Sequence, residues 1–550
     1  MDTQRLILFV VFSFSIMMLW DSWQKEQHPI PAQTVQTATS QVASTTPVPT
    51  TALSATPPAT APDLLPQMDQ GEKLRVSTDT LNVVIDTAGG DIRHLELLKH
   101  HDAVDKNKNF ILFADQKPHI YVAQSGLLGN GLPSHKTRYT AQASDYRLAD
   151  GAQDIRVTLT APEVAGVKVD KIFTFHRDSY VIDVEYKIHN GGTAAIAPNA
   201  YYQLVRDEST PDGDPRFVKT YTGPAVYTDK GKFQKVSFSD IEKDKASFEK
   251  QSKDGWVAML QHYFFSAWLP KDGVAREFYT KKLADKLFAA GVILPVGTIA
   301  PGAEGVLSVP LYAGPQEQEK LSKLAPGLDL TVDYGWLTVI AAPLFWVLSM
   351  IHKGVDNWGV AIILLTVLIK LAFYPLSAKS YRSMAHMRVL GPKLQKLKEQ
   401  YGDDRQRLHQ AMMDLYKTEK VNPLGGCLPV LVQIPVFISL YWVLLASVEM
   451  RHAPFALWIQ DLSAADPYYV LPIIMGITML IQTKLNPTPP DPIQAKVMMV
   501  MPFAFSIFFF FFPAGLVLYW VVNNTLSIAQ QWQITRNAEQ EQAAKGHGKR

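Results

Sequence analysis

The sequence has very little cysteine, because Cys427 is the only one in 550 residues. A single cysteine excludes a disulfide within the chain and a metal site built from several cysteines. An excess of charge of one sign is also missing, since the formal net charge is only +2. This balance gives no basic signature of specific nucleic-acid recognition. No nucleophile–base pair or set of metal ligands stands out either, so we predict no enzymatic activity and no cofactor.

Apolar residues, in contrast, make up 47% of the chain and are unevenly distributed. The apolar run Leu6–Trp20 has a length that fits a signal peptide or a short membrane span. No small-x-small cleavage site follows it, so we expect residues 1–23 to be an uncleaved membrane anchor. Residues 24–69 are rich in Pro, Thr and Ala, which is typical of a disordered linker because such a segment cannot bury a core.

Residues 70–330 show the pattern of an all-β domain. In "SYVIDVEYKIHNGG", the apolar residues alternate with charged ones, and "NGG" is a turn signal. Repeated short strands with Gly and Asp turns predict a β-sandwich.

Five apolar segments near the length of a membrane-crossing helix follow the β-domain. They span residues 358–374, 427–446, 468–483, 497–512 and 516–533. Together with the anchor they predict a polytopic α-helical membrane protein with six spans.

The distribution of Lys and Arg predicts the orientation of these spans. Residues 375–426 carry ten Lys and Arg against five Asp and Glu, so the positive-inside rule places this segment in the cytoplasm. The same rule places both termini, including the tail 534–550, in the cytoplasm and the β-domain in the periplasm. Residues 334–353 are also apolar enough to span, but a span there would move the basic segment outside. We therefore expect 334–353 to be an amphipathic helix at the outer membrane interface.

The basic segment 375–426 has the pattern of a helical hairpin, with a turn at "YGDD". Its charges either solvate the hairpin and set the topology or form a docking arm for a cytoplasmic partner. The charged residues of interest are Arg388, Lys393, Lys396, Lys398, Arg405 and Arg407.

Lys370 lies inside the apolar stretch "ILLTVLIKLAFYPLS", four residues after Thr366 and hence on the same helix face. Its ammonium either snorkels to the cytoplasmic headgroups or lies in a wet cavity. Gln433, Ser439 and Asn523 are polar residues in other predicted spans that could line such a cavity. No Asp or Glu lies inside any predicted span, so a counter-charge for Lys370 would arrive on a substrate.

Long ordered stretches of the chain closely resemble the YidC/Oxa/Albino family of membrane protein insertases. The stretches are "NWGVAIILLTVLIKLAFYPLS", "KVNPLGGCLPVLVQIPVFISLYWVL", "APFALWIQDLSAADPYYVLPIIMG" and "FPAGLVLYWVVNN". The resemblance implies that the protein inserts and folds integral proteins of the bacterial inner membrane. It also implies a periplasmic β-supersandwich and a core of five spans around a hydrophilic groove.

The resemblance further implies roles for particular residues. A positive charge in the groove falls on Lys370, with Thr366 nearby, and Tyr519 and Trp520 match an aromatic pair on the last span. A hydrophobic slide for the client helix falls on Ile434, Pro435, Phe503 and Phe508. Many members carry arginine where this chain has Lys370, and some carry tyrosine where it has Trp520.

The partners that the resemblance implies are nascent membrane proteins, membrane lipids, the Sec translocon, and ribosomes or targeting factors that meet the basic hairpin. Two other functions fit a membrane protein of this layout. A secondary transporter usually contains an acidic residue inside the membrane or an inverted repeat, and the sequence shows neither. A periplasmic chaperone would use the helices only as an anchor.

Overall fold

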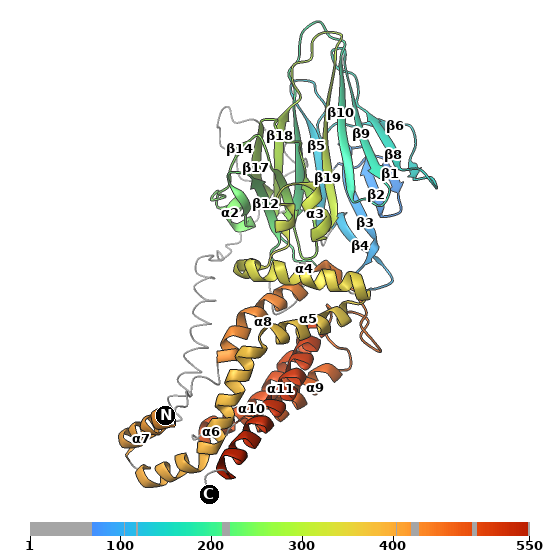
Figure 1. The fold of residues 1–550 in the computed structure, drawn as a ribbon. Coiled ribbons are helices and arrows are strands. Elements are labelled where there is room, and N and C mark those ends of the chain that lie inside the picture. The colour runs from blue at the N-terminus through green and yellow to red at the C-terminus, as the bar shows by residue number, and fades with distance from the viewer. Residues whose placement is uncertain are drawn as a thin grey trace, which may run out of the picture. The chain divides into compact units, whose positions relative to one another are not determined.

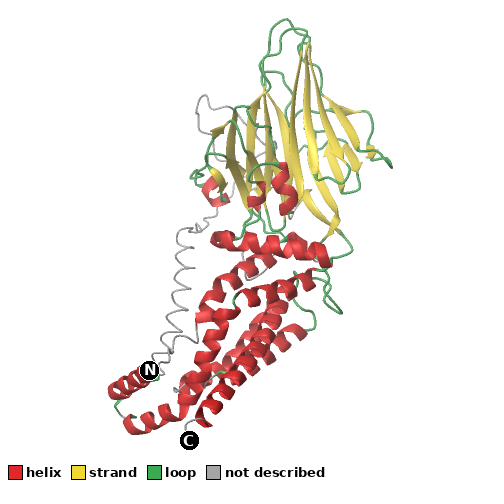
Figure 2. Cartoon of the chain, viewed as in Figure 1, coloured by secondary structure: helices red, strands yellow, loops and turns green. Residues whose placement is uncertain are grey.

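The computed structural model describes residues 69–103, 105–116, 119–211, 220–402, 404–419, 428–486 and 492–547. The expected anchor, and the expected linker up to residue 68, lie outside these described residues. The described chain divides into two compact units, one ending at Val332 and the other beginning at Asp333 (Figure 1). The first consists mainly of strands and the second of helices (Figure 2).

The first unit is a β-sandwich of two large sheets, as predicted for residues 70–330. Among the described strands every pairing is antiparallel except that of β1 with β7. In spatial order, the ten-stranded sheet contains β14 (Gln251–Ser252), β17 (Arg276–Ala284), β18 (Leu287–Pro295), β11 (Asn199–Asp207), β5 (His119–Leu128), β4 (Asn109–Gln116), β3 (Asp91–His101), β2 (Leu81–Asp86), β1 (Lys73–Ser77) and β7 (Asp145–Arg147). The nine-stranded sheet contains β13 (Lys232–Lys235), β12 (Gly223–Thr228), β15 (Trp256–Leu260), β16 (Phe264–Trp268), β19 (Glu304–Pro315), β10 (Val181–Asn190), β9 (Val167–His176), β8 (Asp154–Thr160) and β6 (Thr140–Ala141). Short helices of this unit are α2 (Phe238–Glu242), α3 (Gln318–Leu324) and η1 (Leu328–Thr331).

Strand β10 shows how the sequence pattern builds the core. Its buried residues Ile182, Val184, Tyr186 and Ile188 alternate with more exposed ones, which confirms the predicted faces. The strand pairs with β9 on one side and β19 on the other. Its apolar face can therefore only be buried against the second sheet.

Hydrogen bonds also join the two sheets across the interior. The Tyr121 hydroxyl of β5 donates to the carbonyl oxygen of Met259 in β15 at 3.0 Å. The hydroxyls of Ser125 in β5 and Tyr186 in β10 lie 3.0 Å apart. Because buried polar groups are costly without partners, these bonds favour one alignment of the sheets.

The second unit is a helical bundle in which α11 packs against α5, α6, α8 and α9. The five predicted spans fall on α5, α8, α9, α10 and α11. The elements are η2 (Gly335–Leu337), α4 (Thr338–Val355), α5 (Trp358–Ala372), α6 (Tyr374–Tyr401), α7 (Arg405–Thr418), α8 (Leu428–Ala446), η4 (Val448–Met450), α9 (Val470–Leu485), α10 (Pro492–Phe508), η5 (Phe509–Phe511) and α11 (Ala514–His547).

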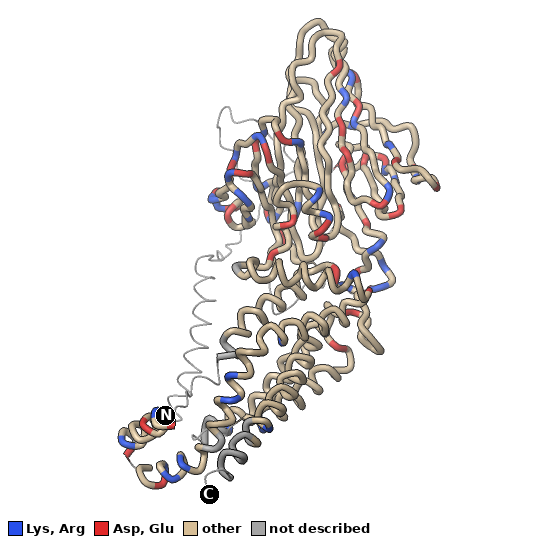
Figure 3. The backbone as a smooth tube through the Cα atoms, viewed as in Figure 1, with Lys and Arg blue, Asp and Glu red and all other residues tan. Residues whose placement is uncertain are grey.

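By length and composition, α4 is the one described helix that could cross a membrane by itself. Helix α5 and the first half of α6 reach this size only as a pair, which is bent by 66° at Phe373. The apolar parts of α8, α9 and α10 are shorter. Figure 3 shows that Lys, Arg, Asp and Glu recur along α6 and α7 but are sparse on the other helices of the bundle.

A loop between α8 and α9 is tied to the starts of two helices. The Asn357 side chain caps α5 by accepting from the Val360 N–H, and it also donates to the Phe455 carbonyl oxygen at 3.0 Å. The Gly515 N–H, at the start of α11, donates to the Leu462 carbonyl oxygen at 2.9 Å. The loop thus covers the end of the bundle at which α5 and α11 begin.

Candidate functional site

A cavity of about 220 Å³ lies inside the helical unit, among α5, α6, α8, α9 and α11. Its wall combines hydroxyl and amide side chains with aromatic rings. None of the described residues on this wall is an Asp or a Glu. The residues are Lys370, Ser377, Ser380, Tyr381, Met384, Gln433, Ile434, Phe437, Gln482, Asn486, Tyr519, Trp520, Asn523, Asn524 and Ser527.

Lys370 lies in the last turn of α5 and is only 7% exposed. Its Nζ donates a hydrogen bond to Ser527 Oγ of α11 at 2.7 Å. Ser527 Oγ in turn donates to the Asn523 carbonyl oxygen at 2.7 Å. The hydrogen-bond partner of the ammonium is therefore neutral, and no described residue on the cavity wall carries a negative charge to compensate Lys370.

Helices α8 and α11 meet along the same wall. Gln433 Nε2 donates to Asn523 Oδ1, so Asn523 accepts through both its side chain and its backbone. The Phe437 ring meets the Trp520 ring edge to face, with centroids 4.8 Å apart. Amide and aromatic groups thus lie side by side, which gives the wall both hydrogen-bonding and apolar parts.

Two residues that we predicted for the groove, Thr366 and Ser439, do not line this cavity. The Thr366 hydroxyl donates to the Ile362 carbonyl oxygen at 2.7 Å, and the Ser439 hydroxyl donates to the Pro435 carbonyl oxygen at 2.8 Å. Both hydroxyls are satisfied within their own helices and neither residue lines the cavity. The other five predicted groove residues line it, namely Lys370, Gln433, Tyr519, Trp520 and Asn523.

The sequence reasoning missed a polar face of α6. Ser377, Ser380, Tyr381 and Met384 line the cavity, although we assigned the whole segment 375–426 to a cytoplasmic hairpin. Their spacing of three and four residues is the signal that could have revealed a face turned toward the bundle. Gln482 and Asn486, at the end of α9, also line the cavity and were not predicted as groove residues.

The residues predicted for the slide are largely exposed. Phe503 and Phe508 on α10 are 56% and 52% exposed, and Ile434 on α8 is 44% exposed. Pro435 is partly buried. Ile434 also lines the cavity, so the polar wall continues into an apolar one at this residue.

Several basic side chains of α6 and α7 are exposed, and two of them form ion pairs. Lys393, Lys396 and Lys398 are exposed. Lys393 forms an ion pair with Glu419, and Arg407 forms one with Asp404 at 3.2 Å. The side chains of Arg388 and Arg405 lie outside the described residues. Exposed pairs of this kind contribute little to stability.

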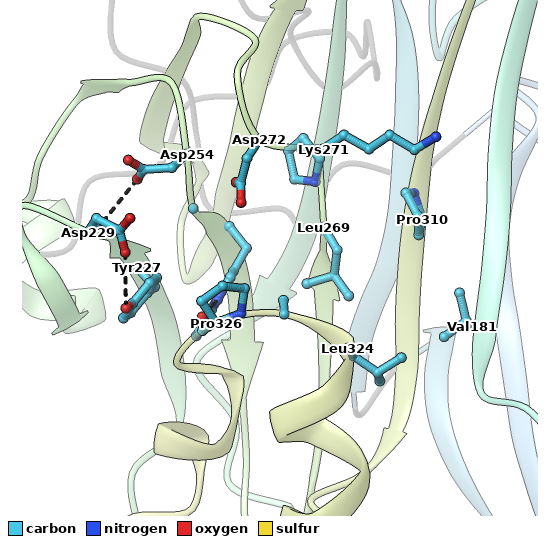
Figure 4. A pocket seen from close by; sticks show the side chains of 14 residues that line it. Val181, Tyr227, Asp229, Asp254, Leu269, Lys271, Asp272, Pro310, Leu324 and Pro326 are labelled. Atoms are coloured by element: carbon cyan, nitrogen blue, oxygen red, sulfur yellow. Dashed lines mark hydrogen bonds between the residues drawn. The ribbon is translucent and has the colours of Figure 1, made fainter.

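The β-sandwich contains a second cavity, of about 260 Å³ (Figure 4). The stacked rings of Tyr227 and Trp256, with centroids 5.6 Å apart, form part of its wall, and Asp229 and Asp254 lie at one side. The buried Arg276 side chain donates to several backbone carbonyls of the wall, including that of Gly255 at 2.7 Å. In the described part of the chain, no group of three His, Cys, Asp or Glu residues is placed to hold a metal ion.

Comparison with known families divides the chain much as the structure does. Residues 73–347 match the family described as YidC periplasmic domain, and residues 350–542 match the 60Kd inner membrane protein family. Together the two matches define a class, namely inner membrane proteins with a periplasmic domain.

Individual relatives narrow this class. The chain is 60% identical to the membrane protein insertase YidC of Methylobacillus flagellatus, covering 99% of each chain. It is 58% identical to the insertase YidC of Nitrosospira multiformis, covering 98% of each. A solved structure of an active YidC insertase is 19% identical and covers 84% of this chain and 92% of its own, with a TM-score of 0.39.

The chain belongs to the YidC family of membrane protein insertases. It is thus an inner membrane protein whose clients are nascent membrane proteins. Insertion moves a polypeptide without making or breaking a covalent bond in it, so this family does not consist of enzymes.

Proposed function

We propose that the cavity beside Lys370 is the groove that receives the polar external segment of a client. The observation that carries this proposal is the buried ammonium of Lys370 on a wall whose described residues include no carboxylate. In a low-dielectric site, an uncompensated positive charge attracts acidic and polar groups more strongly than in water. The amide and hydroxyl groups of the wall reduce the cost of holding that charge.

The client helix leaves along an apolar path in this proposal. Ile434 lies at the edge of the cavity, and Phe503 and Phe508 present exposed rings on α10. Pro435, one residue from Ile434, belongs to the same path. Burial of an apolar helix in lipid is favourable by itself, so the exit needs no nucleotide hydrolysis.

The topology that we propose has six spans, five of which form the core around the groove. The basic α6–α7 hairpin and both termini face the cytoplasm, and the β-sandwich faces the periplasm. Helix α4 lies at the outer interface although its length would allow it to span. The loop between α8 and α9 covers the periplasmic end of the groove.

The same topology suggests where partners bind. Exposed Lys393, Lys396 and Lys398 would meet ribosomes or targeting factors, as would Arg388, Arg405 and Arg407. We propose action both alone and with the Sec translocon. The apolar faces of α9 and α10 would contact membrane lipids.

Substitution of Lys370 tests the groove. The experiment measures insertion of a single-span client with an acidic external tail, and of the same client with a neutral tail, in cells depleted of the native protein. We expect Lys370→Arg to support insertion of both clients. We expect Lys370→Ala to lower insertion of the acidic client by about tenfold relative to the neutral one, because the loss of about 1.4 kcal/mol of charge attraction is a factor of ten. Lys370→Glu should lower it further, because the new carboxylate repels an acidic tail.

Lys484→Ala is the matched control, since Lys484 is an exposed lysine in the last turn of another apolar helix, α9. It should leave both clients unaffected. If Lys370→Ala and Lys370→Glu insert both clients as well as the unchanged protein does, Lys370 is a snorkelling residue and the groove does not act by charge.

A further inference from the structure

Ser527 holds the ammonium of Lys370 in an arrangement that involves two helices. Ser527 lies on α11, 157 residues after Lys370, and is 3% exposed. Its hydroxyl carries a single proton, which it donates to the Asn523 carbonyl oxygen one turn earlier. Toward Lys370 the hydroxyl can therefore only accept, and its lone pairs are oriented by the α11 backbone. The Tyr381 hydroxyl of α6 also forms a hydrogen bond with Ser527.

This arrangement fixes the position of the charge without neutralising it. An ammonium has three N–H donors, and the bond to Ser527 uses one of them. Lys370 also lines the cavity, so the bond holds its head group at the wall. A carboxylate in place of Ser527 would hold Lys370 equally well, but it would cancel the charge that a client is to meet.

We infer that Ser527 is a positioning residue that sets the preference of the groove for acidic client segments. It anchors the Lys370 ammonium through a neutral acceptor and thereby leaves the positive charge for the client. This inference rests on the proposed role of Lys370 in the groove.

Three substitutions of Ser527 test the inference in the full-length protein, with the acidic-tail and neutral-tail clients described above. The readout is the ratio of acidic-client to neutral-client insertion, because a general loss of folding lowers both clients together. Ser527→Ala should lower this ratio by about threefold to tenfold, since a hydrogen bond to a charged group is lost. Ser527→Asp should lower it by about tenfold or more, because the new carboxylate pairs with Lys370. Ser527→Thr should keep the ratio unchanged, because the hydroxyl is retained.

Thr525→Ala is the matched control. The Thr525 hydroxyl also donates to its own helix, to the Val521 carbonyl oxygen at 2.8 Å, but Thr525 is exposed and does not line the cavity. Its removal should leave the ratio unchanged.

A double variant distinguishes a failure of the inference about Ser527 from a failure of the proposal about Lys370. In a Lys370→Ala background, Ser527→Ala should cause no further fall in the ratio, because the two residues act as one unit. If Lys370→Ala lowers the ratio while Ser527→Ala and Ser527→Asp do not, the inference about Ser527 is wrong and the role of Lys370 stands. If Lys370→Ala leaves the ratio unchanged, both are wrong.

Discussion

At the scale of single residues, the β-sandwich buries charges as well as apolar groups. Lys171 of β9 and Asp91 of β3 are both almost completely buried. Lys171 Nζ donates to the carbonyl oxygens of Gly89 and Ser125, and Asp91 Oδ2 accepts from Gln124 at 2.8 Å. Burial raises the pKa of Asp91 to about 6 and lowers the pKa of Lys171 to about 8, while the attraction between the two charges opposes both shifts.

Lys171→Met should destabilise the sandwich in a pH-dependent way. Without the ammonium, the pKa of buried Asp91 rises further, while in the unfolded chain it stays near 3.8. A carboxyl group whose pKa is higher in the folded state than in the unfolded state makes its full contribution to folding stability at pH values below its unfolded pKa. This contribution is lost as the pH rises through its folded pKa. We expect a loss of about 3–5 kcal/mol in the free energy of unfolding at pH 7 and a smaller loss at pH 5. Pulse proteolysis in urea, with the full chain in detergent micelles, measures the free energy of unfolding at each pH.

Lys168→Met is the control on the same strand. Lys168 is 65% exposed in its pair with Glu163, so its loss should change stability by less than about 0.5 kcal/mol at either pH. An equal loss for Lys171→Met at pH 5 and pH 7 would show that packing of the side chain, and not its charge, stabilises the core.

The residue scale also shows how far sequence reasoning reaches into the site. Lys370 could be singled out because a charge in an apolar run is costly and needs a reason. Ser527 could not, because its contact with Lys370 depends on how α5 and α11 pack. The spacing of Thr366 and Lys370 predicted a shared face, but only Lys370 lines the cavity, and the Thr366 hydroxyl donates to its own backbone.

At the scale of elements, close packing of α5 against the loop between α8 and α9 depends on a glycine. A Cβ added to Gly359 would lie 2.1 Å from the Phe455 ring. Asn357, two residues earlier, holds the Phe455 carbonyl oxygen by a hydrogen bond. The start of α5 is thus fitted to this loop by both a small residue and a polar one.

Gly359→Ala should therefore lower the unfolding temperature in detergent micelles. Overpacking of this kind costs about 1–3 kcal/mol, which exceeds the helix propensity gained by alanine. Gly354→Ala in α4 is the matched control, because a Cβ there meets no atom within 4 Å. It should raise stability by about 0.5–1 kcal/mol. If the two variants shift the unfolding temperature in the same direction, the contact with Phe455 does not constrain α5.

Helix ends could be predicted only where apolar character or turn residues change. The segment 358–374 was predicted and α5 spans Trp358–Ala372. The last segment was predicted to end at 533, yet α11 continues to His547. Beyond 533 the helix is polar, so it carries no apolar signal, although residues such as Ala and Gln favour helix.

At the scale of the whole molecule, the β-sandwich could be predicted but its strand order could not. Alternation in β10 reports which face is buried, and this is local information. The pairing of β5 with β11 and the bond from Tyr121 to Met259 join residues far apart in sequence. Such contacts depend on how all the strands pair with one another, so they cannot be predicted from the sequence of a single segment.

The described chain forms two compact units, and every residue that lines the Lys370 cavity belongs to the second. A chain lacking residues 70–330 should therefore keep the groove and insert a single-span client at a rate close to that of the whole protein. The measurement is insertion of the acidic-tail client in depleted cells, with the amount of the shortened chain in the membrane determined in parallel. Lys370→Ala in the shortened chain should still lower insertion, which shows that the remaining activity uses the groove. If the shortened chain reaches the membrane in normal amounts but inserts nothing, the β-sandwich carries the function, and the protein is a periplasmic chaperone anchored by its helices.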